Sequence, residues 1–295
     1  MRHLLSIRDL TVAELNWILA ASEQPARRVL QEKGVGLYFE KPSSRTRNSM
    51  EMAVFTLGGH PVSMQAEEVG LGVRESVEDV VRTLAGYHRF IGARVFDHAT
   101  LEAMAAVDAV PIINLLSDFS HPLQTLADLL TLRQHWRRLA GRTVAWIGDG
   151  NNVARSLIIG CGLAGMHIKL ACPAGHEPDP VAVDAARSAG VEVLVTDDPA
   201  AAAEGADAVC TDVWVSMGQE SEAKAREDAF ARYQVNQQLM DKAAPDALFL
   251  HCLPAHRGLE VTAEVIDGPA SVVWDQAANR MLAARGLLVW LHEHG

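Results

Sequence analysis

Hydroxyl and guanidinium side chains gather in the stretch FEKPSSRTRNSME, residues 39–51, where an apolar run gives way to a helical pattern. Ser43, Ser44 and Thr46 can each supply a hydroxyl. Arg45 supplies a fixed fork of N–H donors, and a helix that begins here adds free backbone N–H groups. Because all of these groups stabilise negative charge, the stretch predicts a site for a phosphate-like ligand. An ordinary capped helix with solvated charges is the alternative.

Two arginines in this stretch are expected to have different roles. Arg45 and Arg47 are two positions apart, so on a helix their side chains point about 200° away from each other. Only one of them can then readily face the anion. Arg47 has Glu51 four residues further on, a spacing that favours a helical ion pair. We therefore assign Arg47 a structural role and leave Arg45 for the ligand.

Further donors follow other apolar runs of the first half. His121 and Gln124 lie at the start of a predicted helix that follows VPIINLL. His121 could donate a hydrogen bond to a carbonyl oxygen, and Gln124 could hydrogen-bond to an amide group. Arg94 lies at the end of another run, FIGARVF. Ligands of parallel sheets bind at the carboxyl ends of strands, so these donors are expected to converge. Taken singly, the His-Pro turn resembles a capping feature and Arg94 a surface residue.

The segment TVAWIGDGNNVARS has some features of a dinucleotide-binding turn, because a strand runs into Gly148-x-Gly150 and then into a helix. Val153 occupies the position of the third glycine, which disfavours close approach of a cofactor. The amides of Asn151 and Asn152 instead suit a zwitterionic ligand. A nicotinamide-dependent oxidoreductase therefore remains only as an alternative.

Two later strand ends carry groups that could hold an amine. Asp212 can bind an ammonium group, and Ser216 and Met217 follow it in a Ser-Met-Gly turn with the features of a mobile lid. His251 and Cys252 end the apolar run ALFLHCL. No further residues that bind metals occur at the usual spacing from this pair, so a metal site is not favoured. The thiol of Cys252 could instead orient an amine or accept its proton. Inert packing is the alternative for the cysteine.

The elements that position these residues alternate between short apolar runs and helical patterns, which indicates mostly parallel α/β sheets. We predict two doubly wound domains, residues 1–136 and 137–274, and a C-terminal helix, residues 275–295, that packs back on the first domain. Arg280 lies early in that helix, where a solvated face is the simplest interpretation. The expected strands are VGLYF, HPVSM, FIGARVF, VPIINLL, TVAWI, HIKLA, VEVLVT, DAVCTDVW and ALFLHCL.

Composition limits the classes of function. A chain of 295 residues fits roughly two domains. Its net charge of -11 disfavours broad contact with nucleic acid or an anionic membrane, so an anion site must be local. The 4 cysteines are far apart and form no C-x-x-C pair, which is typical of reduced thiols. The N-terminal segment resembles neither a signal peptide nor a membrane span, and we expect a soluble cytoplasmic protein.

Together these motifs resemble the aspartate/ornithine carbamoyltransferase family. SSRTR is similar to the family's S-T-R-T-R motif for carbamoyl phosphate, and HPLQ is similar to its H-P-x-Q motif. DVWVSMG and HCLP resemble the two signatures of the ornithine branch. The motifs occur in the family's order and spacing, and the resemblance covers nearly the whole chain.

The resemblance implies transfer of a carbamoyl group from carbamoyl phosphate to L-ornithine, giving citrulline and phosphate. It makes the first domain the carbamoyl-phosphate-binding domain and the second the ornithine-binding domain. Carbamoyl phosphate would be bound by Ser43, Ser44, Arg45, Thr46, Arg94, His121, Pro122, Leu123, Gln124, Cys252, Leu253 and Arg280. Ornithine would be bound by Asn152, Asp212, Ser216 and Met217. Catalytic roles would fall to Arg45, Arg94, His121 and Cys252.

The resemblance also implies no metal and no organic cofactor, and a homotrimer, or a multiple of it, whose sites are shared between subunits. Neither nucleic acid nor membrane is an expected partner. The reaction belongs to arginine biosynthesis and the urea cycle. Rival functions are a carbamoyltransferase for another amine, such as putrescine or an acylated ornithine, and a catalytically silent paralogue that binds ligand. Asp212 and the Ser-Met-Gly turn favour free ornithine, because either rival amine would leave a group near Asp212 unmatched.

Three positions depart from the family's pattern. Ser44 replaces the usual threonine but keeps the hydroxyl, and Met50 stands where an aromatic residue usually precedes the glutamate. Gly70 stands where relatives carry a Gln or His that reaches the neighbouring subunit's site. Either Arg74 takes over as the donor between subunits or that contact is missing.

Overall fold

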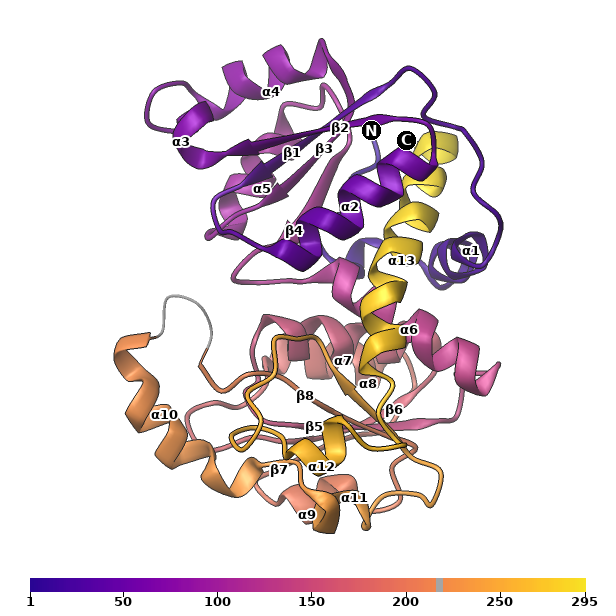
Figure 1. Cartoon of the computed structure of the whole chain (residues 1–295), viewed down its shortest axis with the longest axis vertical. Helices are drawn as coiled ribbons and strands as arrows, with labels where there is room; N and C mark the ends of the chain where they lie inside the picture. The colour runs from indigo at the N-terminus through magenta and orange to yellow at the C-terminus, as the bar shows by residue number, and fades with distance from the viewer. Residues whose placement is uncertain (216–219) are drawn as a thin grey trace. The chain divides into compact units, whose positions relative to one another are not determined.

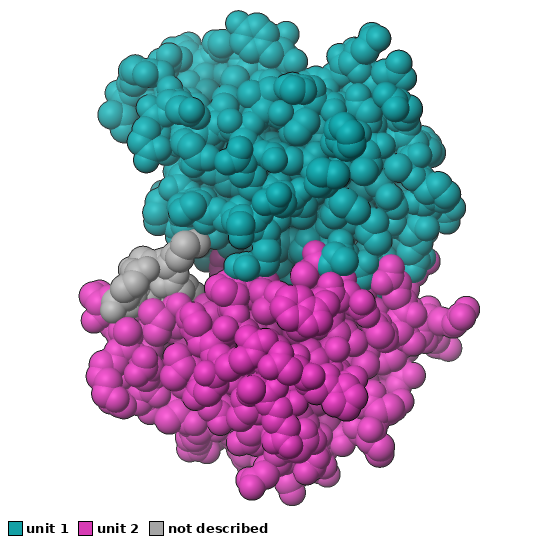
Figure 2. Space-filling view, in the orientation of Figure 1, with its two compact units in different colours: residues 1–130, 278–295 teal, residues 131–277 magenta. Residues whose placement is uncertain are grey.

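The computed structural model describes residues 1–215 and 220–295 and divides into two compact units. Unit 1 comprises Met1–Leu130 and Ala278–Gly295, and unit 2 comprises Thr131–Ala277 (Figure 2). Each unit is a parallel β-sheet covered by helices (Figure 1), which confirms the predicted fold class. Among the helices of the described residues, none is long and apolar enough to cross a bilayer.

The sheet of unit 1 places its strands in the order β2-β1-β3-β4, all parallel. From β1 the chain moves to one side to form β2, and it then crosses back past β1 to form β3 and β4. Right-handed crossovers therefore put the helix after β1 on one face and the helices after β2 and β3 on the other. The carboxyl ends of β1 and β3 are neighbours where the direction reverses, which is where ligands bind in such sheets. The strands are β1 (Gly34–Phe39), β2 (His60–Gln65), β3 (His88–Arg94) and β4 (Ile112–Leu116).

The helices of unit 1 begin at recognisable caps. Ser43 caps α2 by accepting the N–H of Thr46, and Thr11 and Glu14 form a capping box at α1. The last helix, α13, packs against α1, where its Gly286 lies against Ser22. The helices are η1 (Ile7–Asp9), α1 (Val12–Ser22), α2 (Ser44–Thr56), α3 (Ala66–Val69), α4 (Val77–Ala85), α5 (His98–Ala106), the first part of α6 (Pro122–Trp136), and most of α13 (Val273–His294).

The sheet of unit 2 repeats the same logic with the order β7-β6-β5-β8-β9. The chain runs outward from β5 to β7, then returns to β8 and β9, so the carboxyl ends of β5 and β8 adjoin at the reversal. The strands are β5 (Thr143–Ile147), β6 (His167–Ala171), β7 (Val193–Thr196), β8 (Ala208–Thr211) and β9 (Leu248–His251). The helices are α7 (Asn152–Ala164), α8 (Pro180–Ser188), α9 (Pro199–Ala203), η2 (Glu220–Glu222), α10 (Ala223–Phe230), η3 (Ala231–Tyr233), α11 (Gln237–Met240) and α12 (Ala263–Ile266).

The glycines after β5 have a structural reason that involves no cofactor. Gly148 has a φ of 137°, a conformation that a side chain disfavours. A Cβ at Gly150 would lie 2.5 Å from the backbone of Glu177, so the two segments pack backbone to backbone. The Gly-x-Gly pattern is therefore explained by the turn and its packing, which removes the main reason for the dinucleotide interpretation.

Candidate active site

Two buried guanidinium groups converge on one hydroxyl in unit 1. Arg280 donates from Nη2 to Oγ1 of Thr46 at 3.0 Å, and Arg94 donates from Nη1 to the same oxygen at 3.5 Å. Arg94 ends β3, Thr46 lies in the first turn of α2, and Arg280 comes from α13; all three are 6% exposed or less. Positive charge is thus concentrated beside a helix N-terminus, which is the arrangement that binds a phosphate group. Because Arg280 is buried, the solvated-face interpretation of this residue is wrong.

The start of α2 presents its hydroxyls and Arg45 next to this point. Ser43 uses its hydroxyl oxygen as the helix cap, and Ser44 is exposed at the first helical position. Arg45 is partly exposed, and within residues 1–215 and 220–295 its side chain forms no hydrogen bond or ion pair. Arg47 pairs with Glu51 at 2.8 Å, as its spacing predicted.

Gln124 has a fixed amide orientation. Its Oε1 accepts from Nη1 of Arg280 at 2.5 Å, and its Nε2 donates to Oδ1 of Asp128 at 2.8 Å. Pro122 and Leu123, between His121 and Gln124, are buried, and Pro122 is the first residue of α6, where its missing N–H costs nothing. The four-residue spacing of Gln124 and Asp128 was a helical signal for this pair that the sequence interpretation did not use.

His121 is a neutral ring at physiological pH. Burial lowers the pKa of its imidazole well below the ordinary 6.5, and the charges of Arg280 and Arg94 lower it further. A neutral imidazole keeps one N–H donor and one acceptor nitrogen. We call Thr46, Arg94, His121, Gln124 and Arg280 the anion cluster.

The lowered pKa of His121 makes a prediction about stability. Below about pH 6.5 the unfolded chain protonates this ring while the folded protein does not, so the unfolded state binds more protons. Stability from this residue is therefore complete above that pH and falls as the pH is lowered, by up to about 1.4 kcal/mol per pH unit. His121→Gln should flatten the pH dependence of urea unfolding below that value. An unchanged slope in His121→Gln would contradict the prediction.

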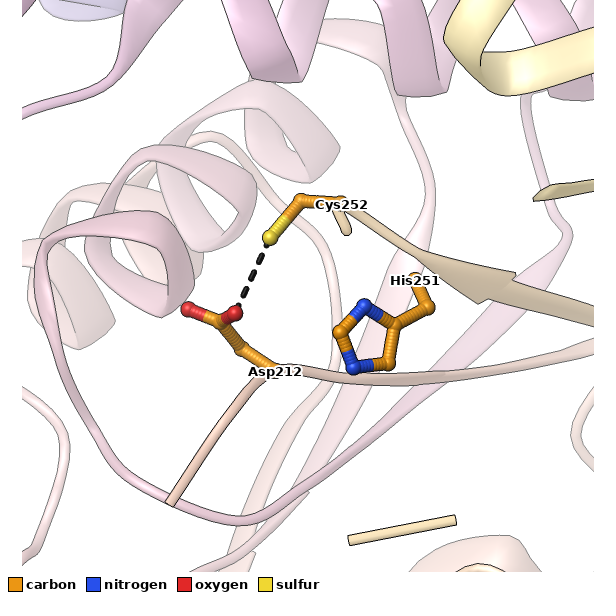
Figure 3. Close-up of side chains that lie close together, drawn as sticks. All are labelled: Asp212, His251 and Cys252. Carbon is orange, nitrogen blue, oxygen red and sulfur yellow. Dashed lines mark hydrogen bonds between the residues drawn. The ribbon is translucent and has the colours of Figure 1, made fainter. Parts of the chain in front are cut away.

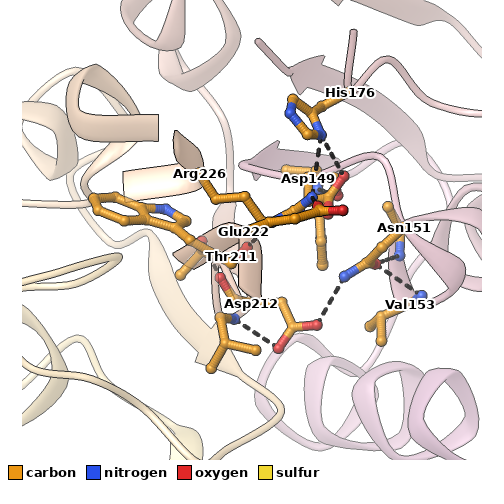
Figure 4. Close-up of polar contacts among 12 residues, drawn as sticks. Asp149, Asn151, Val153, His176, Thr211, Asp212, Glu222 and Arg226 are labelled. Atoms are coloured by element: carbon orange, nitrogen blue, oxygen red, sulfur yellow. Dashed lines mark hydrogen bonds and ion pairs between the residues drawn. The ribbon is translucent and has the colours of Figure 1, made fainter. Parts of the chain in front are cut away.

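In unit 2, Asp212 is held at the end of β8 by donors from three segments. Asn151 donates from Nδ2 to Oδ2 at 3.0 Å, and the N–H of Val213 donates to Oδ1 at 2.8 Å (Figure 4). The thiol of Cys252 donates to the same Oδ1 at 2.9 Å (Figure 3). Asn151 is itself fixed, because its side-chain oxygen caps α7 and accepts from Val153 N and Ala154 N. We call Asn151, Asp212 and Cys252 the Asp212 cluster.

The Asp212 cluster offers a carboxylate that is 6% exposed and an adjacent thiol, which together suit an ammonium or amine ligand. Asn152, the first residue of α7, is only partly exposed. Ser216 and Met217, which the sequence assigned to the same ligand, lie outside the described residues.

The imidazole of His251 lies close to Asp212 and Cys252, but both of its nitrogens are already used. Nδ1 accepts the N–H of Leu253 at 2.9 Å, so Nε2 carries the proton and donates to Oε1 of Glu260 at 3.1 Å. A metal ion between these three side chains would have to displace one of those contacts. The geometry therefore gives His251 the role of holding the turn that follows Cys252.

A buried ion pair between Arg226 and Asp149 holds the segment that follows Asp212. Arg226 in α10 pairs with Asp149 and donates from Nε to the carbonyl oxygen of Trp214 at 2.5 Å (Figure 4). His176 lies 3.7 Å from the same carboxylate. Burial raises the pKa of Asp149 even though Arg226 lowers it. The Arg226 guanidinium thus ties α10 both to Trp214 and to the segment that follows β5.

Comparison with known proteins identifies the family. The family model described as "Aspartate/ornithine carbamoyltransferase, carbamoyl-P binding domain" matches residues 2–134. The model described as "Aspartate/ornithine carbamoyltransferase, Asp/Orn binding domain" matches residues 140–291. The chain belongs to the aspartate/ornithine carbamoyltransferase family.

Individual members of the aspartate/ornithine carbamoyltransferase family match along nearly their whole length. Ornithine carbamoyltransferase of Methanosarcina acetivorans is 43% identical over 98% of this chain and 99% of its own. The enzyme of that name from Parafrankia sp. is 46% identical over 98% of this chain and 96% of its own. The solved ornithine carbamoyltransferase of Pyrococcus furiosus superposes with a TM-score of 0.96 at 42% identity, covering 100% of this chain and 98% of that one.

The departure of Gly70 from the carbamoyltransferase family pattern has a local cause. Helix α3 ends at Gly70 with a φ of 66°, the left-handed conformation of a helix C-cap, which favours glycine. Arg74 then folds back and donates to the carbonyl oxygens of Glu68 at 2.7 Å and Val69 at 3.2 Å. Within the described chain, the guanidinium of Arg74 therefore caps its own loop.

Proposed function

We propose that this member of the carbamoyltransferase family transfers the carbamoyl group of carbamoyl phosphate to L-ornithine, giving L-citrulline and phosphate. The observation that carries the proposal is the anion cluster, in which Arg94 and Arg280 meet at Thr46 beside a neutral His121. The full-length similarity to proteins named ornithine carbamoyltransferase supports the choice of acceptor.

Carbamoyl phosphate would be held within unit 1. The N-terminal turn of α2, with Ser43, Ser44, Arg45 and Thr46, and the guanidinium of Arg94 would bind the phosphate. The N–H of His121 would donate to the carbonyl oxygen. Gln124 keeps a second lone pair on the oxygen that accepts from Arg280, so it can also accept from the carbamoyl NH₂ group.

Ornithine would be held by unit 2. Asp212 would bind the ammonium group of the amino acid, with Asn152, Ser216 and Met217 as the other contacts of its α-amino and α-carboxylate ends. Asn151 would act through Asp212, because it fixes one carboxylate oxygen. The thiol of Cys252 and the carbonyl of Leu253 would approach the reacting amine and the carbamoyl group.

The reaction needs positioning and charge stabilisation more than a strong base. The lone pair of the neutral side-chain amine forms the new C–N bond at the carbonyl carbon, and negative charge grows on the carbonyl oxygen. Donors at that oxygen from His121 and the arginines stabilise this charge. The C–O bond to phosphate then breaks with its electron pair, and the departing phosphate takes the amine's proton.

An acceptor panel tests the proposal. Purified protein would receive carbamoyl phosphate with L-ornithine, putrescine, N-acetylornithine or L-aspartate, and each carbamoylated product would be quantified by mass spectrometry. We expect citrulline to form with a kcat/KM at least about 100-fold above the others, because Asp212 and its neighbours bind a free amino acid. Preferential formation of N-carbamoylputrescine would make the rival amine correct. Binding of carbamoyl phosphate with no product from any amine would indicate a silent paralogue.

We further propose a cytoplasmic homotrimer that acts in arginine synthesis. Large apolar side chains exposed on unit 1 support association, including Phe55 at 66% and Val73 at 94% exposure. Val73 lies beside Arg74 in the loop that relatives are expected to extend to a neighbouring subunit. Light scattering after size exclusion measures the assembly, and a monomer that retains full activity would contradict shared sites.

A further inference from the structure

Unit 1 contains a cavity of about 230 Å³ that is separate from the anion cluster. It is formed by the end of α1, the loop that follows it, the end of α2, and α13. Apolar side chains make most of the wall, and the polar ones are Gln24, Arg27 and Arg285. The apolar lining residues are Trp17, Ala20, Ala21, Pro25, Ala26, Leu57 and Val289.

The charge of this cavity is positive although the whole chain carries -11. Its lining includes two arginines and no acidic residue. Arg27 pairs with Glu293. Arg285 instead donates from Nη2 to the carbonyl oxygens of Ser22 at 2.9 Å and Gln24 at 2.6 Å.

Arg285 is the residue that points to an anionic ligand. Its partners across residues 1–215 and 220–295 are these two carbonyl oxygens, and no carboxylate balances its charge. Burial lowers the pKa of Arg285, and no acidic neighbour opposes that change. Both hydrogens of Nη2 go to these carbonyl oxygens, so a ligand carboxylate would accept from Nη1 and supply the missing negative charge.

The shape of the cavity limits the rest of the ligand. An apolar cavity of about 150 Å³ accommodates benzene, so 230 Å³ has room for one ring and a short side group. Trp17 offers a flat surface for stacking, while the alanines and Pro25 leave the space open.

We propose that this cavity binds a small aromatic monocarboxylate, with its carboxylate on Arg285 and its ring against Trp17. The ligand would contact the two helices, α2 and α13, that carry Thr46 and Arg280. Arg285 lies five residues after Arg280 in α13, or about 7.5 Å along the axis. Leu57, which lines the cavity, is the C-cap residue of α2, whose first turn carries Thr46.

Occupation of the cavity should therefore change the binding of an anion at Thr46 and Arg280, which lie on the same two helices. This second step rests on the proposed function, whereas binding of the carboxylate does not. The two can be measured separately, so failure of one is distinguishable from failure of the other.

Isothermal titration with phenylacetate tests the binding site. Saturable binding is expected for phenylacetate, with at least tenfold weaker binding of 2-phenylethanol, which lacks the carboxylate, and of acetate, which lacks the ring. Arg285→Gln should weaken phenylacetate at least tenfold, while Arg28→Gln, in the same loop but outside the lining, should leave it unchanged. Absence of saturable binding, or equal binding of 2-phenylethanol, would overturn the proposal.

A cavity-filling variant keeps the test decisive if Arg285→Gln fails to fold. Ala21→Leu places a larger apolar side chain in the cavity without removing the arginine. It should abolish phenylacetate binding in a protein with wild-type melting behaviour, and undiminished binding would show that the ligand lies elsewhere.

A separate titration tests whether the cavity is coupled to the anion cluster. Titration of carbamoyl phosphate with and without saturating phenylacetate should give different dissociation constants. Identical constants would overturn the coupling and leave the binding result standing.

Discussion

Arg45→Ala is expected to reduce kcat/KM for carbamoyl phosphate by about 100- to 1,000-fold, the usual cost of removing one preorganised donor to developing charge. Arg45 lies in the first turn of α2 next to Thr46, and its side chain is free of hydrogen bonds and ion pairs with the rest of the described chain. Folding should therefore be unaffected. Steady-state kinetics with carbamoyl phosphate as the varied substrate, together with thermal melting, measure both quantities.

Arg47→Ala is the matched control for this experiment, because it removes the same group from the opposite side of the same helical turn. It breaks an ion pair with Glu51 in which Arg47 is 51% exposed, so the loss of stability should be at most about 0.5 kcal/mol. Its kcat/KM should stay near that of the wild type. Arg45→Lys should fall between the two, since lysine keeps the charge and loses the fork. Equal catalytic loss in both alanine variants, with unchanged melting, would show that the assignment by helical face is wrong.

Glu260→Ala is expected to produce the largest loss of stability. The side chains of His251 and Glu260 are both 0% exposed, and Oε1 of Glu260 accepts from His251 and from the N–H of His256 at 2.6 Å. Removal of the carboxylate leaves the buried N–H of His251 without an acceptor, at about 1–3 kcal/mol, and also takes the acceptor from the part-buried N–H of His256. Urea unfolding followed by circular dichroism measures the change in the free energy of unfolding.

Glu260→Gln separates the structural role from a catalytic one. The glutamine carbonyl oxygen can still accept from His251, so most of the stability should return. The turn after Cys252 is held through Nδ1 of His251, and Leu253 within it has a φ of 58°, a conformation that costs a non-glycine residue energy. Slight displacement of this turn should lower kcat by up to about 100-fold with little change in KM for ornithine. Wild-type kcat in a Glu260→Gln protein of normal stability would rule out this positioning role.

The positions of the strands could be predicted from the sequence, because buried parallel strands are continuous apolar runs between turn residues. Each expected strand overlaps an observed one, for example VGLYF with β1 and TVAWI with β5, both largely buried. Helix α1 was not predicted, although Thr11 and Glu14 have the capping-box spacing that marks its start. The C-terminal helix, expected over residues 275–295, spans Val273–His294.

Convergence at strand ends could be argued from topology, but the partner of each side chain could not. Thr46 and Arg280 are 234 positions apart, and only the packing of α13 brings them together. The contact between His251 and Glu260 likewise depends on the path of an irregular turn. An irregular turn has no sequence periodicity from which such a contact could be predicted. Asp128 could have been predicted from its four-residue spacing to Gln124, but Gln124 was considered only as a ligand contact.

Unit 1 is interrupted in the sequence, with unit 2 inserted between Leu130 and Ala278. During synthesis on the ribosome, residues 1–130 emerge first but lack Arg280, one of the two guanidiniums at Thr46. The anion cluster of unit 1 therefore cannot form until the whole of the inserted unit 2 and then Arg280 have been translated. An arrested chain that ends before α13 should be unable to retain carbamoyl phosphate, however well its sheet has already formed.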